Sequence, residues 1–101
     1  MLCVCVAAEG RGAEKYDTGE IYVGDYMAGE RWGKGTFKHA NGQTLVSMWR
    51  DNRPTGEGVQ WNVDHSKAAR LKNGIPTGGV QLTVAAEIAA SIGIPVPSEW
   101  M

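Results

Sequence analysis

Two cysteines near the N-terminus are the first residues whose types could support chemistry. Cys3 and Cys5 lie two residues apart, and a Cys-x-Cys pair can begin a metal site. The chain has no further cysteine, and its two histidines, His39 and His65, lie in separate predicted loops, which argues against zinc. We therefore expect two buried, reduced thiols in a reducing compartment, either the cytosol or an organelle interior.

Two further segments have the residue types of an active site. Asp64-His65-Ser66 has the residue types of a catalytic triad, but contiguous residues cannot converge on one reacting atom, so a turn is expected there. Residues 29–36, GERWGKGT, resemble a phosphate-binding loop with the spacing one residue short and Gly35 in place of the magnesium-binding Ser or Thr. This segment also joins two predicted strands and offers no helix N-terminus to a phosphate. We expect no catalytic residues, no cofactor and no metal.

Glycines and aromatic residues, which would position any site, recur at one fixed interval. Four pairs are each 23 residues apart: Tyr22 and Leu45, Tyr26 and Trp49, Gly33 and Gly56, Gly35 and Gly58. A fixed period in the twenties indicates a repeat array. The chain has 14 Gly, and their concentration in these repeats indicates turns rather than low complexity.

The first unit, residues 19–41, reads as a β-hairpin. Tyr22, Gly24 and Tyr26 alternate with other residues, so both rings stand on one face of a strand, and the glycine allows a neighbouring ring to approach the backbone. Gly29 and the run from Gly33 to Gly35 are expected to form a loop of about six residues before a short return strand, Thr36 to Lys38. Asn41-Gly42 is a strong turn signal that joins this unit to the next.

The pattern Tyr-x-Gly-x-Tyr-x-x-Gly-x-x-x-Gly-x-Gly, residues 22–35, resembles the MORN repeat (membrane occupation and recognition nexus). The second copy keeps Trp49, Gly56 and Gly58 but has Leu45, Ser47 and Asn52 at other signature positions. A third copy from His65 is degenerate, with Ala68, Arg70 and Lys72 at the aromatic and glycine positions. The resemblance implies a β-hairpin meander that acts as a scaffold or partner-binding surface, often near membranes.

The chain is expected to form one domain with three parts. Residues 1–18 are an N-terminal tail, with an apolar run at 1–8 that suits an edge strand or docked tail better than a signal peptide, and a linker at 9–18. Residues 19–80 form the sheet of about six strands, in which Val59, Trp61 and Val63 share one face and Ala68 to Lys72 is the final strand. Residues 81–101 form a short helix and an extended tail.

The expected helix begins with Thr83 as N-cap and ends at Gly93 as C-cap. Only Glu87 and Ser91 are polar within it, so most of its surface requires burial. We expect this helix to cap the open end of the sheet, because each repeat of an array covers only its neighbour.

The residues fall into two expected classes. A structural set carries the repeat signature: Tyr22, Gly24, Tyr26, Gly29, Gly33, Gly35, Phe37, Trp49, Gly56, Gly58 and Trp61. An alternative role for some of its aromatic members is to line a concave face that receives an extended peptide or a partner helix. The candidates for partner binding are Trp32, Trp100, Arg31, Lys34, Arg50 and Arg53.

The leading functional interpretation is non-enzymatic: a protein-protein interaction or scaffold module, an accessory subunit of a larger assembly such as a photosynthetic or respiratory membrane complex. One alternative is peripheral binding to anionic lipid headgroups through basic repeat loops, and another is a regulatory fragment of a larger enzyme. The net charge of −1 and the dispersed basic residues argue against nucleic acid as a partner. No apolar run approaches the length of a membrane span.

Overall fold

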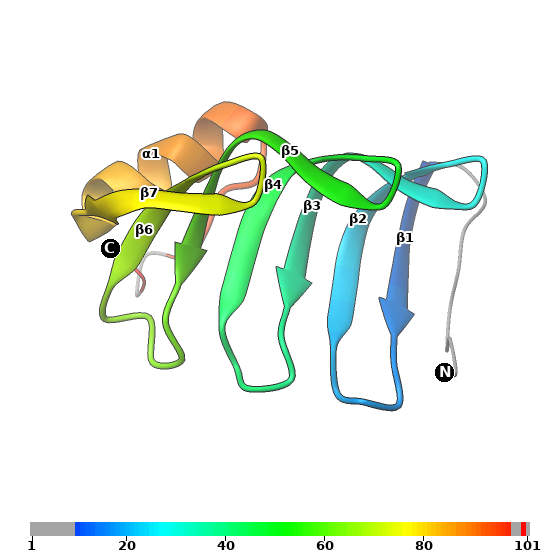
Figure 1. Cartoon of the computed structure of the whole chain (residues 1–101), viewed down its shortest axis with the longest axis horizontal. Coiled ribbons are helices and arrows are strands. Elements are labelled where there is room, and N and C mark those ends of the chain that lie inside the picture. The colour runs from blue at the N-terminus through cyan, green and yellow to red at the C-terminus, as the bar shows by residue number, and fades with distance from the viewer. Residues whose placement is uncertain (1–9, 98–99, 101) are drawn as a thin grey trace.

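The computed structural model describes residues 10–97 and Trp100, which form one antiparallel sheet followed by one helix (Figure 1). The elements are β1 (Gly10–Lys15), β2 (Ile21–Met27), β3 (Glu30–Lys38), β4 (Thr44–Arg50), β5 (Arg53–Trp61), β6 (Ala68–Lys72), β7 (Ile75–Val80) and α1 (Leu82–Ile92). Each strand pairs with the next one along the chain, without a crossover. The predicted fold class, a β-hairpin meander with a short C-terminal helix, is confirmed. The expected tail at residues 1–8, with Cys3 and Cys5, lies outside the described residues.

The sheet has seven strands rather than about six, and it begins before residue 19. Residues 10–15, expected to belong to a linker, form β1 and pair with β2 from Gly10 opposite Tyr26 to Lys15 opposite Ile21. β1 is an edge strand with two glycines and three charged residues, so its sequence lacks the apolar alternation that reveals a half-buried strand.

The turns of the three hairpins are shorter than the sequence suggested. Each hairpin closes through two residues with positive φ, at Ala28-Gly29, Asp51-Asn52 and Asn73-Gly74, and two-residue turns of this kind match the twist of paired strands. The prediction of a loop of about six residues is therefore wrong. Gly33 lies inside β3 at φ 88°, where the register with β2 shifts, and Gly35 pairs directly with Gly24. Asn41-Gly42 forms the expected turn between units.

Beyond the second hairpin, the predicted strand and turn positions are partly corrected. β5 ends at Trp61, so Val63 falls in the following turn and is 57% exposed. Residues 64–66 form the expected turn. Ala68–Lys72 forms a strand but not the last one, because β7 completes a third hairpin without the repeat signature. This hairpin is formed by the pairing of β7 with β6 and turns at Asn73-Gly74.

Helix α1 covers one face of the sheet rather than its open edge. It packs mainly on β5 and also touches β4 and β6, as its position over the β5–β7 end in Figure 1 shows. The predicted N-cap is wrong: Gln81, in an extended conformation, holds that position and makes no side-chain cap bond, while Thr83 lies in the first turn. The predicted C-cap is confirmed, because Gly93 adopts a left-handed conformation at φ 98° and ends the helix.

Replacing the C-cap glycine should destabilise the helix end. We expect Gly93→Ala to lower the free energy of unfolding by about 1 kcal/mol, because φ is positive there and a Cβ would lie 3.1 Å from Lys34 Nζ. Gly93→Asn should lower the free energy of unfolding less than Gly93→Ala does. Its Cβ would meet the same lysine, but Asn tolerates the left-handed conformation better than Ala. Urea denaturation of the three proteins measures both effects. Equal stability of Gly93→Ala and the parent chain would contradict the role of this cap.

Candidate functional site

The alternation of side chains divides the sheet into two faces with different partners. We call one the aromatic face; its buried residues are Tyr16, Tyr22, Tyr26, Phe37, Leu45, Trp49 and Leu71. We call the other the helix face; its buried residues are Val46, Val59, Trp61 and Ala68, which pack against Ala85, Ile88 and Ala89 of α1. Trp61 therefore lies apart from the other four aromatic residues of the predicted structural set.

The rings of the aromatic face are buried and contact one another edge to face. Tyr22 is fully buried, and its ring centroid lies 5.4 Å from that of Tyr26 and 5.3 Å from that of Trp49. Gly24 and Gly35 lie opposite each other on β2 and β3, and a Cβ on either would overlap Tyr22. The signature glycines at these positions thus make room for a ring against the backbone.

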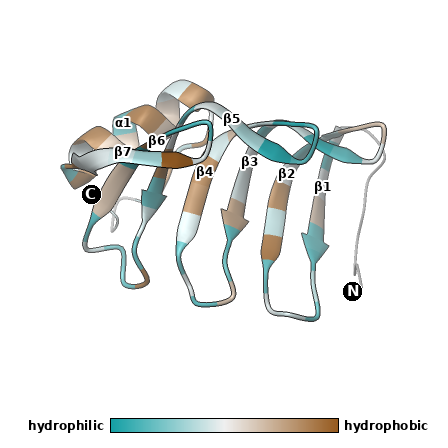
Figure 2. Ribbon diagram, in the orientation of Figure 1, coloured by the Kyte–Doolittle hydropathy of each residue, from teal (hydrophilic) through white to brown (hydrophobic). Residues whose placement is uncertain are grey.

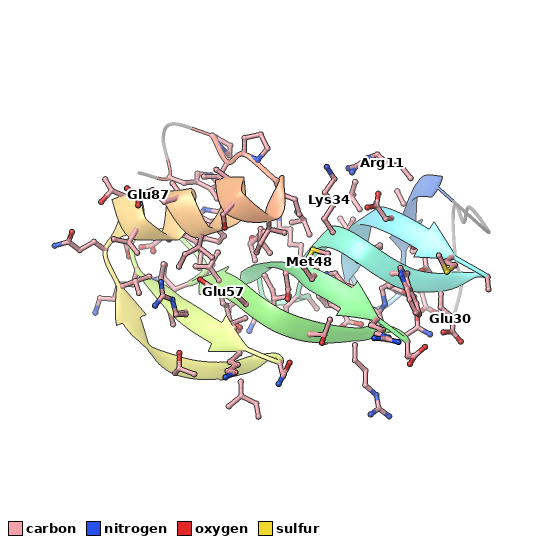
Figure 3. The ribbon with its side chains drawn as sticks, turned by 90° about the horizontal axis from the view of Figure 1, so that it is seen from above. Arg11, Glu30, Lys34, Met48, Glu57 and Glu87 are labelled. Atoms are coloured by element: carbon pink, nitrogen blue, oxygen red, sulfur yellow. The ribbon has the colours of Figure 1, made fainter. Side chains whose placement is uncertain are left out.

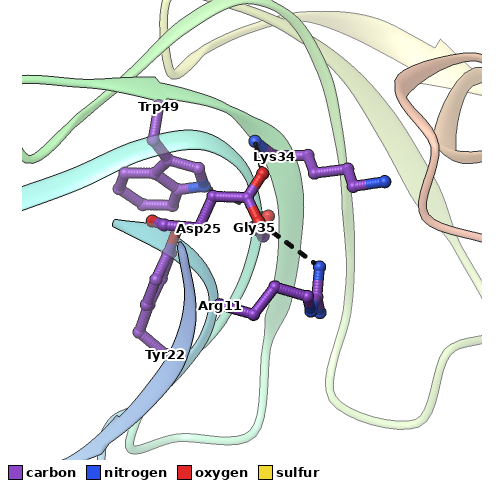
Figure 4. A network of polar contacts seen from close by, with 6 residues as sticks. All are labelled: Arg11, Tyr22, Asp25, Lys34, Gly35 and Trp49. Carbon is purple, nitrogen blue, oxygen red and sulfur yellow. Dashed lines mark hydrogen bonds and ion pairs between the residues drawn. The ribbon is translucent and has the colours of Figure 1, made fainter. Parts of the chain in front are cut away.

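Polar contacts link these rings to the backbone of β2 and β3, and Asp25 extends them to the other face of the sheet (Figure 4). The Tyr22 hydroxyl donates to the Asp25 carbonyl oxygen at 3.0 Å, and Trp49 Nε1 donates to the Gly35 carbonyl oxygen at 3.1 Å. The Asp25 carboxylate accepts the Lys34 backbone N–H at 3.3 Å and lies 3.6 Å from the Arg11 guanidinium. The sequence offered no sign of Asp25, since its partners come from three separate strands. These contacts fix β1, β2 and β3 to one another.

Burial shifts the ionisation of two tyrosines, which gives a pH prediction. Burial and then the Asp25 carboxylate raise the pKa of Tyr22 to about 12. Burial and the hydrogen bond to the Glu14 carboxylate raise the pKa of Tyr26 well above its usual value. Above about pH 10 the unfolded chain therefore loses protons that the folded chain keeps, so stability should fall as the pH rises further.

Denaturant titrations between pH 8 and pH 11 measure this effect. We expect the contribution of the two tyrosines to the free energy of unfolding to be nearly constant up to about pH 9 and to decline above about pH 10. The stability of Tyr26→Phe should decline less steeply with pH than that of the parent chain, because the variant lacks one tyrosine whose pKa is raised in the folded state. Identical slopes for the two proteins would contradict the proposed environment of Tyr26.

Arg31, a predicted partner-binding residue, lies over the aromatic face. Its guanidinium carbon is 4.9 Å from the ring centroid of Trp49 and 5.4 Å from that of Phe37, within the range of cation–π attraction. The same guanidinium donates to the Asn52 carbonyl oxygen at 3.0 Å in the next hairpin turn. Arg31 therefore joins adjacent repeats, and much of its capacity to bind a partner is used within the chain.

Two of the other predicted partner-binding residues, Arg50 and Arg53, pair with each other across β4 and β5 and line the same depression, whereas Trp100 lies elsewhere. The Arg50 guanidinium lies 5.1 Å from the ring centroid of Trp32, and Arg53 lines an open depression of about 660 Å³ beside the β4–β5 turn. Trp100 stacks on His65 with centroids 4.0 Å apart and meets Trp61 edge to face at 5.2 Å. Arg50 and Arg53 thus lie together beside the β4–β5 turn, where Arg31 also bonds to Asn52, whereas Lys34 lies near Gly93.

The helix face is only partly covered by α1. We use the term open half for the uncovered helix-face residues of β1–β3 together with Met48: Arg11, Ala13, Lys15, Ile21, Val23, Asp25, Lys34, Thr36 and Lys38. Val23 is 44% exposed and Met48 is 39% exposed, whereas Val46, two residues before Met48 on the same face of β4, is 1% exposed. Figure 2 shows the apolar bands of β2 away from α1, and Figure 3 shows Arg11 and Lys34 on the same side of the sheet as α1.

A hollow of about 240 Å³ lies on the open half. Its lining residues are Ile21, Val23, Thr36, Lys38, Thr44, His65 and Trp100. The Lys34 side chain passes the C-terminal end of α1, since a Cβ placed on Gly93 would lie 3.1 Å from Lys34 Nζ, and a cation is favourable at that end of a helix. The sequence did not indicate this surface, because its members come from separate strands and from the C-terminal tail.

The described part of the chain lacks two features. Within residues 10–97 and Trp100, no group of three or more His, Cys, Asp or Glu side chains is arranged to hold a metal ion. In the same part, α1 is too short to cross a membrane, and no other helix is present.

The fold and the two faces define a class of protein: a hairpin-repeat sheet whose aromatic residues and glycines hold adjacent strands together. The MORN repeat family matches residues 22–44 and 47–67, so the chain contains two MORN repeats. MORN repeats are generally non-enzymatic modules for interaction or membrane binding. No curated protein matches the chain closely enough to count as a relative.

Proposed function

We propose that this chain is a non-catalytic interaction module that docks on a larger assembly as an accessory subunit. The observation that supports this proposal is the partial cover of the helix face. α1 buries Val46 and Val59 almost completely, while Val23 and Met48 on the same face stay exposed. An exposed apolar surface with charged residues at its edge is typical of a site for a partner.

The positions of the basic residues favour a protein partner over the lipid alternative. Binding of anionic lipid through the repeat loops requires the loop cations to face one side together. Arg31 instead lies over the rings of the aromatic face, and Arg50 lies over Trp32. Both cations have aromatic partners within the chain, which reduces their contribution to a lipid-binding loop.

The native size of the protein tests this function. An epitope-tagged chain, expressed in its own source cells and separated by size without denaturant, should elute well above its mass of 10.9 kDa with a fixed set of companion proteins. Fractionation of membranes would then show whether a photosynthetic, respiratory or other membrane-bound assembly is the host. Elution as a free monomer under low and physiological salt would overturn the proposal.

A further inference from the structure

The repeat relates the open half to the surface that α1 covers. A shift of 23 residues places Val23 on Val46, Thr36 on Val59 and Lys38 on Trp61. α1 lies mainly over β5 and touches β4 and β6, so the equivalent place one repeat earlier is over β3, between β2 and β4. The open half is thus a second version of a helix-binding surface, with no helix from the described part of the chain on it.

The spacing of the strands suits a second helix beside α1. One repeat advances the sheet by two strands, which is about 9.6 Å at the usual strand separation. Packed helices lie about 8–10 Å apart. A helix over β3 would therefore contact both the sheet below and the side of α1, and it would bury Val23 and Met48.

The open half is more basic than the half that α1 covers. The position that Trp61 occupies beneath α1 is held by Lys38 in the earlier repeat, and Lys34, Arg11 and Lys15 share that face. Asp25 is the one carboxylate on the open half, and it pairs with Arg11 at 3.6 Å. The surface therefore combines two exposed apolar side chains, Val23 and Met48, with an excess of positive charge.

We propose that the open half binds an amphipathic helix of a partner protein, about as long as α1, with an apolar stripe and acidic residues along one flank. This inference rests on the proposed function and names its surface and the kind of partner. The apolar stripe would cover Val23 and Met48, and the acidic flank would face Lys34 and Lys38. The opposite charges favour encounter and orientation.

A membrane surface fits the open half less well than a helix. α1 projects from the same side of the sheet, and its exposed surface includes Glu87, so a flat anionic bilayer would meet α1 before Val23. The hollow of about 240 Å³ is bordered by Trp100 and His65, which gives the surface a recess. A rounded helix fills a recess better than a flat surface does.

A library of helix-constrained peptides with randomised exposed positions, selected on the whole chain, tests the proposal. We expect enriched peptides with an apolar stripe flanked by Asp or Glu. Val23→Asp and Lys38→Glu should each weaken their binding about tenfold or more. The matched controls Val63→Asp and Lys67→Glu make the same changes at exposed turn positions off this surface and should leave affinity within about twofold.

Three results would overturn the proposal: no enrichment, enrichment of basic peptides or of peptides without an apolar stripe, or equal effects of the paired variants. Salt-sensitive sedimentation with phosphatidylcholine–phosphatidylserine vesicles that Val23→Asp abolishes would assign the surface to a membrane instead. A dimer of the purified chain that Val23→Asp dissociates would assign it to a second copy. If the native protein has companions whose binding is unchanged by Val23→Asp, this inference fails while the proposed function stands.

Discussion

Gly24→Ala is expected to lower the free energy of unfolding by about 3 kcal/mol. A Cβ at this position would lie 2.5 Å from the Gly35 Cα atom and 2.6 Å from the Lys34 carbonyl oxygen, both in the backbone of the neighbouring strand. It would also lie 2.5 Å from the Tyr22 hydroxyl oxygen. The strands would have to separate or Tyr22 would have to leave its buried position, and the hydrogen bond to Asp25 would be lost with it.

Gly79→Ala is the matched control, because Gly79 is also a strand glycine and a Cβ there would meet only the Ala68 carbonyl oxygen at 3.8 Å. That variant should be as stable as the parent chain or slightly more stable, since alanine reduces the freedom of the unfolded chain. Urea denaturation of both variants measures the difference. Similar stabilities for the two would show that Gly24 has no special role in the packing of Tyr22.

Trp49→Ala is expected to cost about 4 kcal/mol. The indole is buried, it contacts the rings of Tyr22 and Phe37, and it supports the Arg31 guanidinium at 4.9 Å. The variant would leave a cavity at the contact between two repeats and would remove the hydrogen bond to the Gly35 carbonyl oxygen. Thermal and chemical denaturation measure the loss.

Trp49→Phe separates the volume of the ring from its hydrogen bond. It should retain part of the packing, lose the N–H donor, and cost about half as much as the alanine variant. Met48→Ala, at the preceding position but on the open half, should cost less than about 1 kcal/mol because Met48 is exposed. A loss of the same size at Met48 and Trp49 would contradict the assignment of the two faces.

The hairpins could be predicted because the residues that determine each of them lie close together in the sequence. The alternation of Tyr22, Gly24 and Tyr26 and the offset to Trp49 identify paired strands with rings on one side. β1 could not be predicted in the same way, because a polar edge strand gains its structure from the backbone of β2 rather than from its own side chains. The N-cap of α1 was misassigned because Thr83 has the preferred residue type, while the chain direction set by β7 begins the helix two residues earlier.

The candidate surface was less predictable than the fold. Arg31 and Arg50 have the residue type of interface anchors, and only the bend of the hairpins shows that each lies against a ring of the same chain. The open half joins Arg11, Val23, Lys34 and Met48 from four strands, so no sequence window contains it. Its exposure depends on where α1 lies, and the sequence predicts the end of this helix at Gly93 but not its position on the sheet.

A photo-reactive amino acid placed at position 23 and irradiated in the source cells tests the central claim most directly. If the open half is a contact surface, the chain should form one discrete cross-linked product of higher mass, whose attached peptide has the pattern of an amphipathic helix with acidic residues. The same group at position 63, which is more exposed than position 23 but lies in a turn, should leave the chain unlinked. Absence of a product at position 23, or the same products at both positions, would contradict the claim.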